Sequence, residues 1–265
     1  MFDSFGREIY YLRISVTDRC NLRCSYCMPE EGVPWLPHDR ILSLERMAEV
    51  ARAAARMGFY KVRITGGEPL VRKGVVDFVS MLSAVRDIKT IGMTTNGTLL
   101  APFAAELKAR GLGSVNVSLD TMDEERYRVL TRGGRLADAL AGVEAAREAG
   151  LPVKLNAVVG EGDDPAELRA VEAFAAAVGA TVQTIRRYRL DEPKADDERY
   201  ARPAPCALCD RIRLLATGEL KPCLHGDASV PVDFSDIEGS IRRCVGLKPA
   251  CGQAASEHLV SAIGG

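Results

Sequence analysis

Short hydrophobic runs and longer amphipathic runs alternate along the chain from Tyr10 to Ile185. The short runs are rich in β-branched residues, as strands are, and the longer runs repeat their apolar positions with the period of a helix. The predicted strands are Leu12–Val16, Lys61–Ile64, Thr90–Thr94, Ser114–Leu119, Val153–Val159 and Thr181–Ile185. The predicted helices are Ser43–Met57, Val75–Val85, Pro102–Arg110, Ala137–Ala149 and Pro165–Val178. This alternation predicts an α/β fold with a parallel sheet and right-handed crossovers.

The number of strand–helix units and a change of character after Leu190 predict how the chain is organised. Six units are too few to close an eight-stranded barrel, so we expect a curved, open (βα)6 partial barrel of the TIM type. Residues 191–205 are polar and contain prolines, and the remainder has short elements and many cysteines. We therefore expect a barrel domain over residues 1–190 and a small C-terminal subdomain over residues 191–265.

Charge and hydropathy exclude several classes of protein. The formal net charge is −1, so no overall field attracts nucleic acid or an anionic membrane. An anionic ligand must instead be held by locally placed Arg and Lys. No apolar run approaches the roughly 18 residues of a membrane span, and Met1 to Tyr10 lack the basic start and apolar run of a signal peptide. We expect a cytoplasmic protein with no nucleic-acid or membrane partner.

The eight cysteines form two groups of three and two single residues. A disulfide framework is not expected in a long chain without an export signal. Clustered cysteines in a reducing compartment instead indicate metal or iron–sulfur ligands. The first cysteine group is Cys20, Cys24 and Cys27, the second cysteine group is Cys206, Cys209 and Cys223, and Cys244 and Cys251 are left over.

The first cysteine group has the spacing Cys-x3-Cys-x2-Cys and directly follows the first predicted strand. Three thiolates can hold three corners of a cubane iron–sulfur cluster and leave the fourth iron open, whereas cubane clusters otherwise take four cysteines. The alternative is structural zinc, which takes four protein ligands. The nearest candidate for a fourth ligand is His38, eleven residues beyond Cys27.

The second cysteine group has the spacing Cys-x2-Cys-x13-Cys and is accompanied by two arginines. Arg211 and Arg213 alternate, so on a strand both side chains lie on one face, beside the cysteines. Two planar cationic groups suit a purine edge or a phosphate. Two alternatives remain: a zinc site completed by His225, and a solvated strand face.

The first cysteine loop, with the aromatic Tyr26 before its last cysteine, resembles the signature of the radical S-adenosylmethionine (SAM) superfamily. Thr65-Gly-Gly-Glu-Pro69 follows the second strand and is similar to the element that binds the methionyl amino group of SAM in that superfamily. The resemblance implies that SAM contacts Tyr26, Gly66, Gly67 and Glu68, and also Thr94 and Ser118 at the ends of the third and fourth strands.

Several longer motifs together resemble the GTP 3′,8-cyclases of molybdenum cofactor biosynthesis, over nearly the whole chain. They include Leu12-Arg-Ile-Ser-Val-Thr-Asp-Arg-Cys20, Arg63-Ile-Thr-Gly-Gly-Glu-Pro-Leu-Val-Arg72 and Asn116-Val-Ser-Leu-Asp120. The second cysteine group with its arginines and the terminal Gly264-Gly265 are more specific to these cyclases than the first loop is.

The resemblance implies two [4Fe-4S] clusters, one on each cysteine group, with SAM on the first and the guanine of GTP on the second. The reduced first cluster would cleave SAM, and the 5′-deoxyadenosyl radical would remove H3′ of GTP. The ribose radical would then attack C8, giving (8S)-3′,8-cyclo-7,8-dihydroguanosine 5′-triphosphate after reduction. The resemblance also implies an electron donor such as a flavodoxin or ferredoxin, and allows a homodimer. It assigns the guanine to Arg211 and Arg213, the triphosphate to Arg13, Lys61, Arg63 and Lys154, and a catalytic tail to Gly264 and Gly265.

The chain also departs from these cyclases. Residues 191–205 are shorter than the corresponding segment of typical members, and Gln183 stands where they have an arginine, which Arg186 or Arg187 could replace in space. Cys251 or Cys244 could close the fourth iron of the second cluster. A paralogous two-cluster radical SAM enzyme acting on another nucleotide or a small peptide therefore remains an alternative.

Two further alternatives come from other classes of protein. A non-catalytic iron–sulfur scaffold or electron carrier would not need the Gly-Gly-Glu-Pro element. A zinc-bound nucleic-acid module would need a basic stripe with interleaved aromatic residues, which the sequence lacks.

Overall fold

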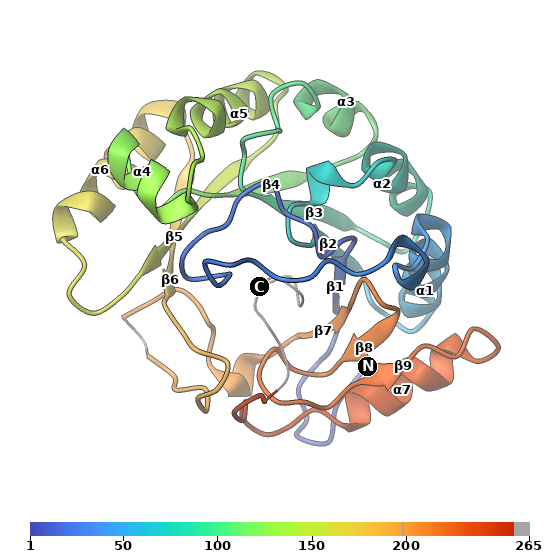
Figure 1. The fold of residues 1–265 in the computed structure, drawn as a ribbon. Helices are drawn as coiled ribbons and strands as arrows, with labels where there is room; N and C mark the ends of the chain where they lie inside the picture. The colour runs from blue at the N-terminus through green and yellow to red at the C-terminus, as the bar shows by residue number, and fades with distance from the viewer. Residues whose placement is uncertain (198, 257–265) are drawn as a thin grey trace.

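The computed structural model describes residues 1–197 and 199–256. Six parallel strands curve around the centre of the molecule, and helices lie outside them (Figure 1). The sheet order is β6-β5-β4-β3-β2-β1-β7-β8-β9. The six strands of the barrel are β1 (Tyr11–Ser15), β2 (Lys61–Thr65), β3 (Thr90–Thr95), β4 (Ser114–Ser118), β5 (Val153–Val159) and β6 (Thr181–Arg186). The predicted α/β fold with a partial barrel is confirmed, and the predicted strands match to within one residue at each end.

The chain after β6 returns to the same sheet on its other edge. β7 (Arg211–Leu214) pairs parallel to β1, and β8 (Glu219–Lys221) and β9 (Val230–Pro231) continue the sheet antiparallel. Buried residues of this part, such as Ile212 and Ile241, belong to the same apolar core as the barrel. The division of the chain at residue 190 into two domains stays a prediction.

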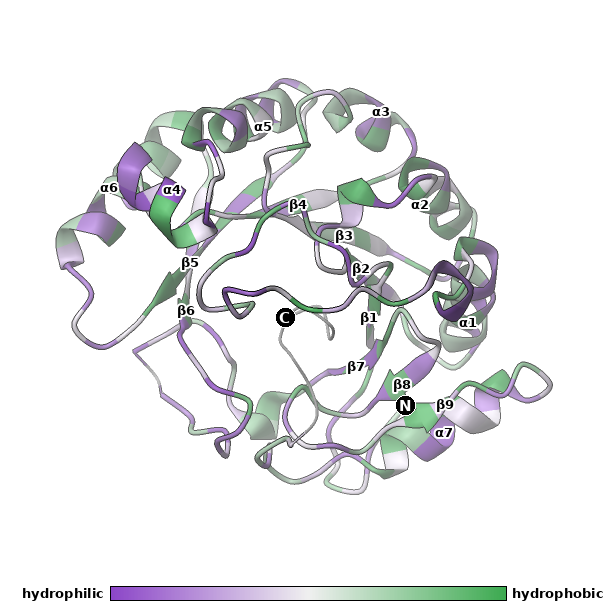
Figure 2. Ribbon diagram, viewed as in Figure 1, coloured by the Kyte–Doolittle hydropathy of each residue, from purple (hydrophilic) through white to green (hydrophobic). Residues whose placement is uncertain are grey.

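The helices cover the outer face of the sheet. They are α1 (Leu44–Arg56), α2 (Val75–Ser83), α3 (Ala104–Ala109), α4 (Glu124–Thr131), α5 (Leu136–Glu148), α6 (Pro165–Val178) and α7 (Ile237–Gly246), with 3-10 turns at His38–Arg40, Pro69–Val71 and Cys206–Leu208. Hydrophobic and hydrophilic positions alternate along them (Figure 2), as expected of helices with one buried side. No helix among the described residues is long and apolar enough to cross a membrane.

Helix α4 was not predicted from the sequence, because its pattern is mostly polar and only Tyr127 and Thr131 are buried. Its start does carry a local signal. The side chain of Asp123 caps the helix by accepting from Arg126 N at 2.7 Å, and Glu124 and Glu125 fill the first turn, where the helix dipole favours negative charge.

Apolar and polar residues alternate along the strands. Apolar side chains therefore lie in the core under the helices, and polar side chains face the inside of the barrel. In β1, Leu12 and Ile14 belong to the core between the sheet and the helices, whereas Arg13 lines a cavity on the opposite face. Asn116 of β4 and Gln183 of β6 line the same cavity. Because successive strand residues point to opposite faces, the sequence places a row of polar side chains inside the barrel.

Candidate active site

The first cysteine loop crosses the open face of the barrel and is held by α4 (Figure 1). Arg23 N donates to Thr131 O at 3.1 Å and Ser25 N donates to Leu130 O at 2.9 Å, so the last turn of α4 supports the middle of the loop. Arg132, which follows the helix with a left-handed φ of 53°, donates to Met28 O at 2.7 Å and to Arg23 O at 3.1 Å. Sequence analysis missed both α4 and Arg132.

Gly66 and Gly67 let the end of β2 lie directly against the start of this loop. Gly67 N donates to Thr17 O at 2.8 Å, and Glu68 N donates to Arg19 O at 2.8 Å. A Cβ atom on Gly67 would lie 2.3 Å from Arg19 O, and one on Gly66 would lie 2.8 Å from Thr17 O. Both glycines are therefore required for packing in addition to any contact with SAM.

The carboxylate of Glu68 is fully buried and does not face the cavity that the two glycines line. It accepts from Thr95 Oγ1 at 2.7 Å, from Asn96 N at 2.7 Å and from Leu70 N at 3.0 Å. Burial raises the pKa of Glu68 to about 7, although these three donors oppose the shift. In this structure Glu68 fixes the loop after β3, and its predicted contact with SAM stays a prediction.

One cavity brings together the predicted SAM-site residues other than Glu68. The three thiols of the first cysteine group line it with Tyr26, Gly66, Gly67, Thr94 and Ser118. The Tyr26 hydroxyl donates to Asp120 Oδ2 at 2.7 Å, and Asp120 Oδ1 accepts from Val158 N at 2.7 Å. Asp120 therefore fixes the aromatic ring, a role that its place in the Asn116–Asp120 motif did not reveal.

The first cysteine group fits a cluster that carries positive charge. Burial, followed by the charge of Cys27, raises the pKa of Cys24 to about 12, and burial and Cys20 raise that of Cys27 to about 12. Thiolates this close and this buried need cations between them, and iron ions supply that charge. His38 lies on an exposed 3-10 turn and does not line this cavity.

A second cavity brings together the second cysteine group and the barrel arginines. Arg13, Arg211 and Arg213 line it with the three thiols, and so does His225. His225 packs against Tyr188 with ring centroids 5.5 Å apart. In the described part of the chain, no three Cys, His, Asp or Glu side chains are arranged to hold a single metal ion.

A cluster of cations surrounds Tyr11, and two of its members, Arg13 and Arg211, also line this cavity. Arg63 Nε donates to the Tyr11 hydroxyl at 2.9 Å, Lys61 Nζ lies 4.6 Å from the ring centroid, and Arg211 Cζ lies 4.9 Å from it. Burial alone would raise the pKa of Tyr11, but the positive charges of Arg13, Arg63, Arg211 and Lys61 lower it to about 8. Burial, and then the charge of Arg213, also lowers the pKa of Arg13.

Carboxylates neutralise only part of the positive charge of this cluster. Asp210 lies 2.7 Å from Arg211 Nε, whereas Arg63 donates to neutral oxygens of Met93 and Asn116, at 3.0 and 2.8 Å. A local excess of positive charge suits a polyanionic ligand. Lys61, Arg63 and Lys154 do not line either of the two cavities, and their contact with a triphosphate stays a prediction.

The two cavities adjoin. Both are lined by Thr94, Asn156, Ile185 and Tyr188, which come from β3, β5, β6 and the segment after β6. Asn156 Oδ1 accepts from Gln183 Nε2 and from Asn116 Nδ2, each at 3.2 Å. A ligand in the first cavity and a ligand in the second would therefore face each other across these side chains.

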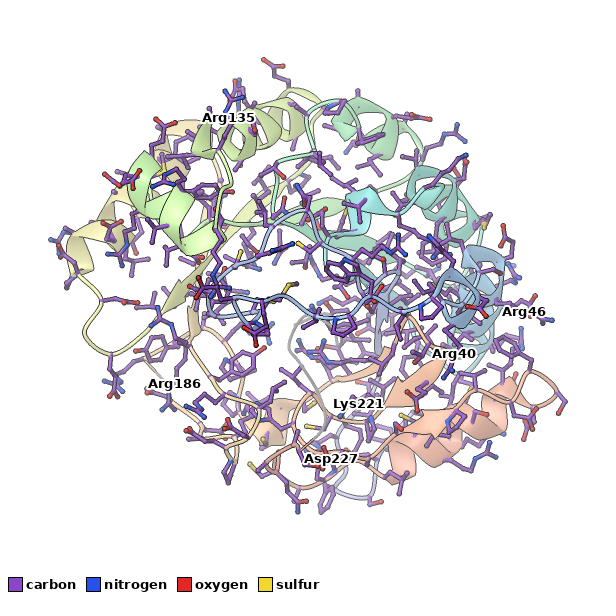
Figure 3. All side chains as sticks on the ribbon, in the orientation of Figure 1. Arg40, Arg46, Arg135, Arg186, Lys221 and Asp227 are labelled. Carbon is purple, nitrogen blue, oxygen red and sulfur yellow. The ribbon has the colours of Figure 1, made fainter. Side chains whose placement is uncertain are left out.

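The structure also places the residues in which this chain departs from the resemblance. Arg187 pairs with Asp163 at 3.2 Å, and Arg186, labelled in Figure 3, lines the first cavity. Neither lines the second cavity beside Gln183; Arg202, from the short segment 191–205, does. Gly264 and Gly265 lie outside the described residues.

The two remaining cysteines have different environments. Cys244 is fully buried in α7 and belongs to the apolar core. Cys251 is exposed, and its sulfur lies 3.1 Å from Cys206 Sγ. Cys251 Sγ also lies 3.6 Å from Lys194 O, to which the thiol donates.

Comparison with known proteins places the chain in a family. Residues 14–175 match the radical SAM superfamily, so the chain belongs to that superfamily of enzymes. A Peptoclostridium acidaminophilum protein named GTP 3′,8-cyclase is 40% identical over 288 positions, covering 92% of this chain and 87% of that protein. A protein of the same name from Thermodesulfovibrio yellowstonii is 38% identical over 325 positions, covering 100% of both. The chain belongs to the family of these GTP 3′,8-cyclases.

The length of this second alignment shows how far the chain is shortened. It has 325 positions and the chain has 265 residues, so at least 60 positions have no residue in this chain.

The solved structure of Streptococcus suis SuiB bound to S-adenosylmethionine is similar in fold, with a TM-score of 0.67 and 16% identity, over 87% of this chain and 64% of that one. Methylornithine synthase (PylB) has a TM-score of 0.55 and 18% identity, over 69% of this chain and 55% of that one.

Proposed function

We propose that this chain is a radical SAM GTP 3′,8-cyclase, which forms (8S)-3′,8-cyclo-7,8-dihydroguanosine 5′-triphosphate in the first step of molybdenum cofactor biosynthesis. One observation carries the proposal. Two cavities, each lined by three cysteines, share a wall at Thr94, Asn156, Ile185 and Tyr188, and the second is also lined by several cationic side chains, Arg13, Arg211 and Arg213 among them. This is the arrangement that a radical transfer from SAM to an anionic nucleotide requires.

The first cavity would hold SAM and a [4Fe-4S] cluster on the first cysteine group. When bound, this cluster supplies the electron for the reductive cleavage of SAM. The chain's own part is to position and to exclude water: Tyr26 is fixed by Asp120, and Gly66 and Gly67 bring β2 against the cysteine loop. Holding the reacting groups close converts a bimolecular step into one within a single complex.

The second cavity would hold GTP and a second [4Fe-4S] cluster, on the second cysteine group. Arg211 and Arg213 lie on one face of β7 and would contact the guanine, since planar guanidinium groups match a purine edge. The cations Arg13, Lys61, Arg63 and Lys154 would take the triphosphate. The chain from Gly264 to Gly265 would complete the active site.

The partners and location belong to the same proposal. A flavodoxin or ferredoxin would supply electrons, and the enzyme would act in the cytoplasm, where cysteine thiols stay reduced. A homodimer would be compatible with this role.

The direct test is product formation. Anaerobically reconstituted protein is incubated with SAM, a reductant and GTP, and the mixture is analysed for 5′-deoxyadenosine and the cyclised nucleotide. We expect both from GTP and no cyclised product from ATP. Formation of 5′-deoxyadenosine without cyclised GTP would instead favour the paralogue that acts on another substrate.

Two variants test the guanine site. Arg211→Ala and Arg213→Ala each remove hydrogen bonds from a charged donor, which are worth about 1.5–3 kcal/mol and correspond to roughly ten- to hundred-fold in binding or rate. Arg242→Ala, on the exposed side of α7, is the matched control. Wild-type GTP affinity and turnover in both site variants would contradict the assignment of the guanine to these arginines.

A further inference from the structure

Two lysine ammonium groups lie against two thiols of the second cysteine group. Lys194 Nζ is 3.3 Å from Cys206 Sγ, and Lys248 Nζ is 3.3 Å from Cys209 Sγ. Both lysines are largely removed from solvent: the side chain of Lys194 is 8% exposed and Lys248 is 4% exposed. A buried ammonium is costly unless its donors are satisfied.

Each ammonium has three acceptors, and in each case one of them is a cysteine sulfur. Lys248 Nζ donates to Arg211 O at 2.7 Å and to Pro222 O at 2.8 Å, and the sulfur of Cys209 is the third acceptor. An ammonium group has three donors, so no donor is left over for another role. The geometry therefore ties the charge of Lys248 to the sulfur of Cys209.

The acceptors of Lys194 follow the same pattern. Lys194 Nζ pairs with Asp196 and donates to Ala204 O at 2.8 Å, and Cys206 Sγ is the third acceptor. Asp196 Oδ2 also accepts from Cys206 N at 3.2 Å. Lys194 and Asp196 belong to the short segment in which the chain departs from typical cyclases, and both contact Cys206. Lys194 thus supplies one of the two ammonium groups.

The first cysteine group has a different electrostatic environment. The donors that reach Cys20 Sγ are uncharged: Leu22 N at 3.4 Å and Asn96 Nδ2 at 3.9 Å. Cys206 and Cys209 each accept from an ammonium group instead. The donors to the two groups of thiols therefore differ in charge.

We propose that Lys194 and Lys248 raise the reduction potential of the cluster held by the second cysteine group above that of the cluster held by the first. Reduction adds one negative charge to a cluster, and a fixed ammonium beside the ligand sulfur stabilises that charge. Hydrogen bonds to the sulfurs and nearby charge are two of the factors that set such potentials. The two lysines thus act on the potential of the second cluster through the sulfurs that bind it. This proposal rests on the cluster sites of the proposed function.

The test isolates the second cluster. The three cysteines of the first group are replaced by Ala, and the remaining cluster is titrated with dithionite while its paramagnetic resonance signal is recorded. We expect Lys194→Met and Lys248→Met to lower the midpoint potential enough to change the ratio of reduced to oxidised cluster at least tenfold at a fixed potential, which is 59 mV for one electron. Lys194→Arg, which keeps the positive charge, should have a midpoint potential close to that of the wild-type second cluster.

Lys108→Met is the matched control. Lys108 is exposed on α3 and its Nζ donates to Gly150 O at 2.9 Å, so the variant loses the same charge and a similar hydrogen bond, far from the cluster. In Lys248→Met, Arg211 O and Pro222 O lose their donor. If that variant fails to fold for this reason, the midpoint potentials of Lys194→Met and Lys194→Arg alone test the proposal.

The outcomes separate the two proposals. A background protein that binds no iron would contradict the cysteine assignment and, with it, the proposed function. Normal iron content with a midpoint potential that moves no further in Lys194→Met than in Lys108→Met would overturn the role of the lysines and leave the proposed function intact.

Discussion

The hydroxyl of Tyr11 accepts a hydrogen bond from Arg63 Nε at 2.9 Å, at the centre of four positively charged side chains. The pair joins β1 to β2: Lys61 is in register with Tyr11, and Arg63 lies two positions further along β2. A phenol that is surrounded in this way ionises more easily than usual, so the charge of this cluster, where we propose that the triphosphate binds, depends on pH.

We expect GTP affinity to fall as the pH rises through about 8, the pKa of Tyr11. Ionised Tyr11 cancels part of the positive charge that attracts the triphosphate, and binding that requires the neutral phenol weakens about tenfold from pH 7 to pH 9. Isothermal titration with GTP at several pH values measures this dependence, and Tyr11→Phe should remove it. A pH dependence of equal size in Tyr11→Phe would assign it to another group.

The lowered pKa of Tyr11 also makes the free energy of unfolding depend on pH, in the direction opposite to that of GTP affinity. The folded-state pKa lies below the usual value of 10, so ionisation of Tyr11 favours the folded protein. Its contribution is full above about pH 10 and is lost as the pH falls through about 8. Denaturant unfolding without GTP, compared between the wild type and Tyr11→Phe, measures this contribution.

Gly92→Ala should impair GTP binding without unfolding the protein. Gly92 is paired with Arg63 across β2 and β3, and a Cβ there would lie 2.8 Å from Arg63 Nη2. The flexible guanidinium can move, but it then loses its bonds to Tyr11 and Asn116. We expect about ten- to hundred-fold weaker GTP binding, as for a lost bond from a charged donor. Gly246→Ala, with no atom within 4 Å of the added Cβ, is the control. Unchanged affinity in Gly92→Ala would mean that Arg63 does not hold GTP.

Replacement of Arg132 should reduce iron loading at the first cysteine group. Arg132 bonds Arg23 O and Met28 O and so holds the loop from both sides. Arg132→Gly and Arg132→Ala both lose these bonds, but Ala keeps the cost of a left-handed φ, so it should be less stable than Gly by about 1 kcal/mol. Iron analysis and thermal unfolding separate the two effects.

Arg135→Ala is the control for this pair. Its side chain is 74% exposed and lies at the outer edge of the molecule in Figure 3. Full iron content in both Arg132 variants would show that the loop does not need this support.

Cys251→Ala should leave the second cluster in place. The ligands of a cubane cluster bind different irons, so two ligand sulfurs do not touch, whereas Cys251 Sγ contacts Cys206 Sγ at 3.1 Å. We expect Cys206→Ala to lose the cluster and Cys251→Ala to keep it. Cys244→Ala should also keep it and lose about 1 kcal/mol of stability, since it leaves a small cavity in the core.

The measurement is the paramagnetic signal of the second cluster, with and without GTP. A signal lost in Cys251→Ala, together with a wild-type signal that saturating GTP does not alter, would mean a fourth protein ligand and a substrate other than GTP.

The parallel strands, most of the helices and both cysteine groups could be predicted from local sequence patterns. The periods of strand and helix are properties of neighbouring residues, and the cysteine spacings are local too. Resemblance to the cyclases then suggested what these groups bind.

Features that depend on residues distant in sequence became evident only from the packing of the folded chain. It showed that the polar helix α4 supports the first cysteine loop, because Leu130 O and Thr131 O meet a loop about a hundred residues earlier in the chain. It buried Glu68 among donors from the next strand. It also joined Lys194 to Cys206 and Lys248 to Cys209, which no spacing predicts. A lysine in a polar segment has no local signal of its partner, because burial and the loss of competing water arise only when the segments pack together.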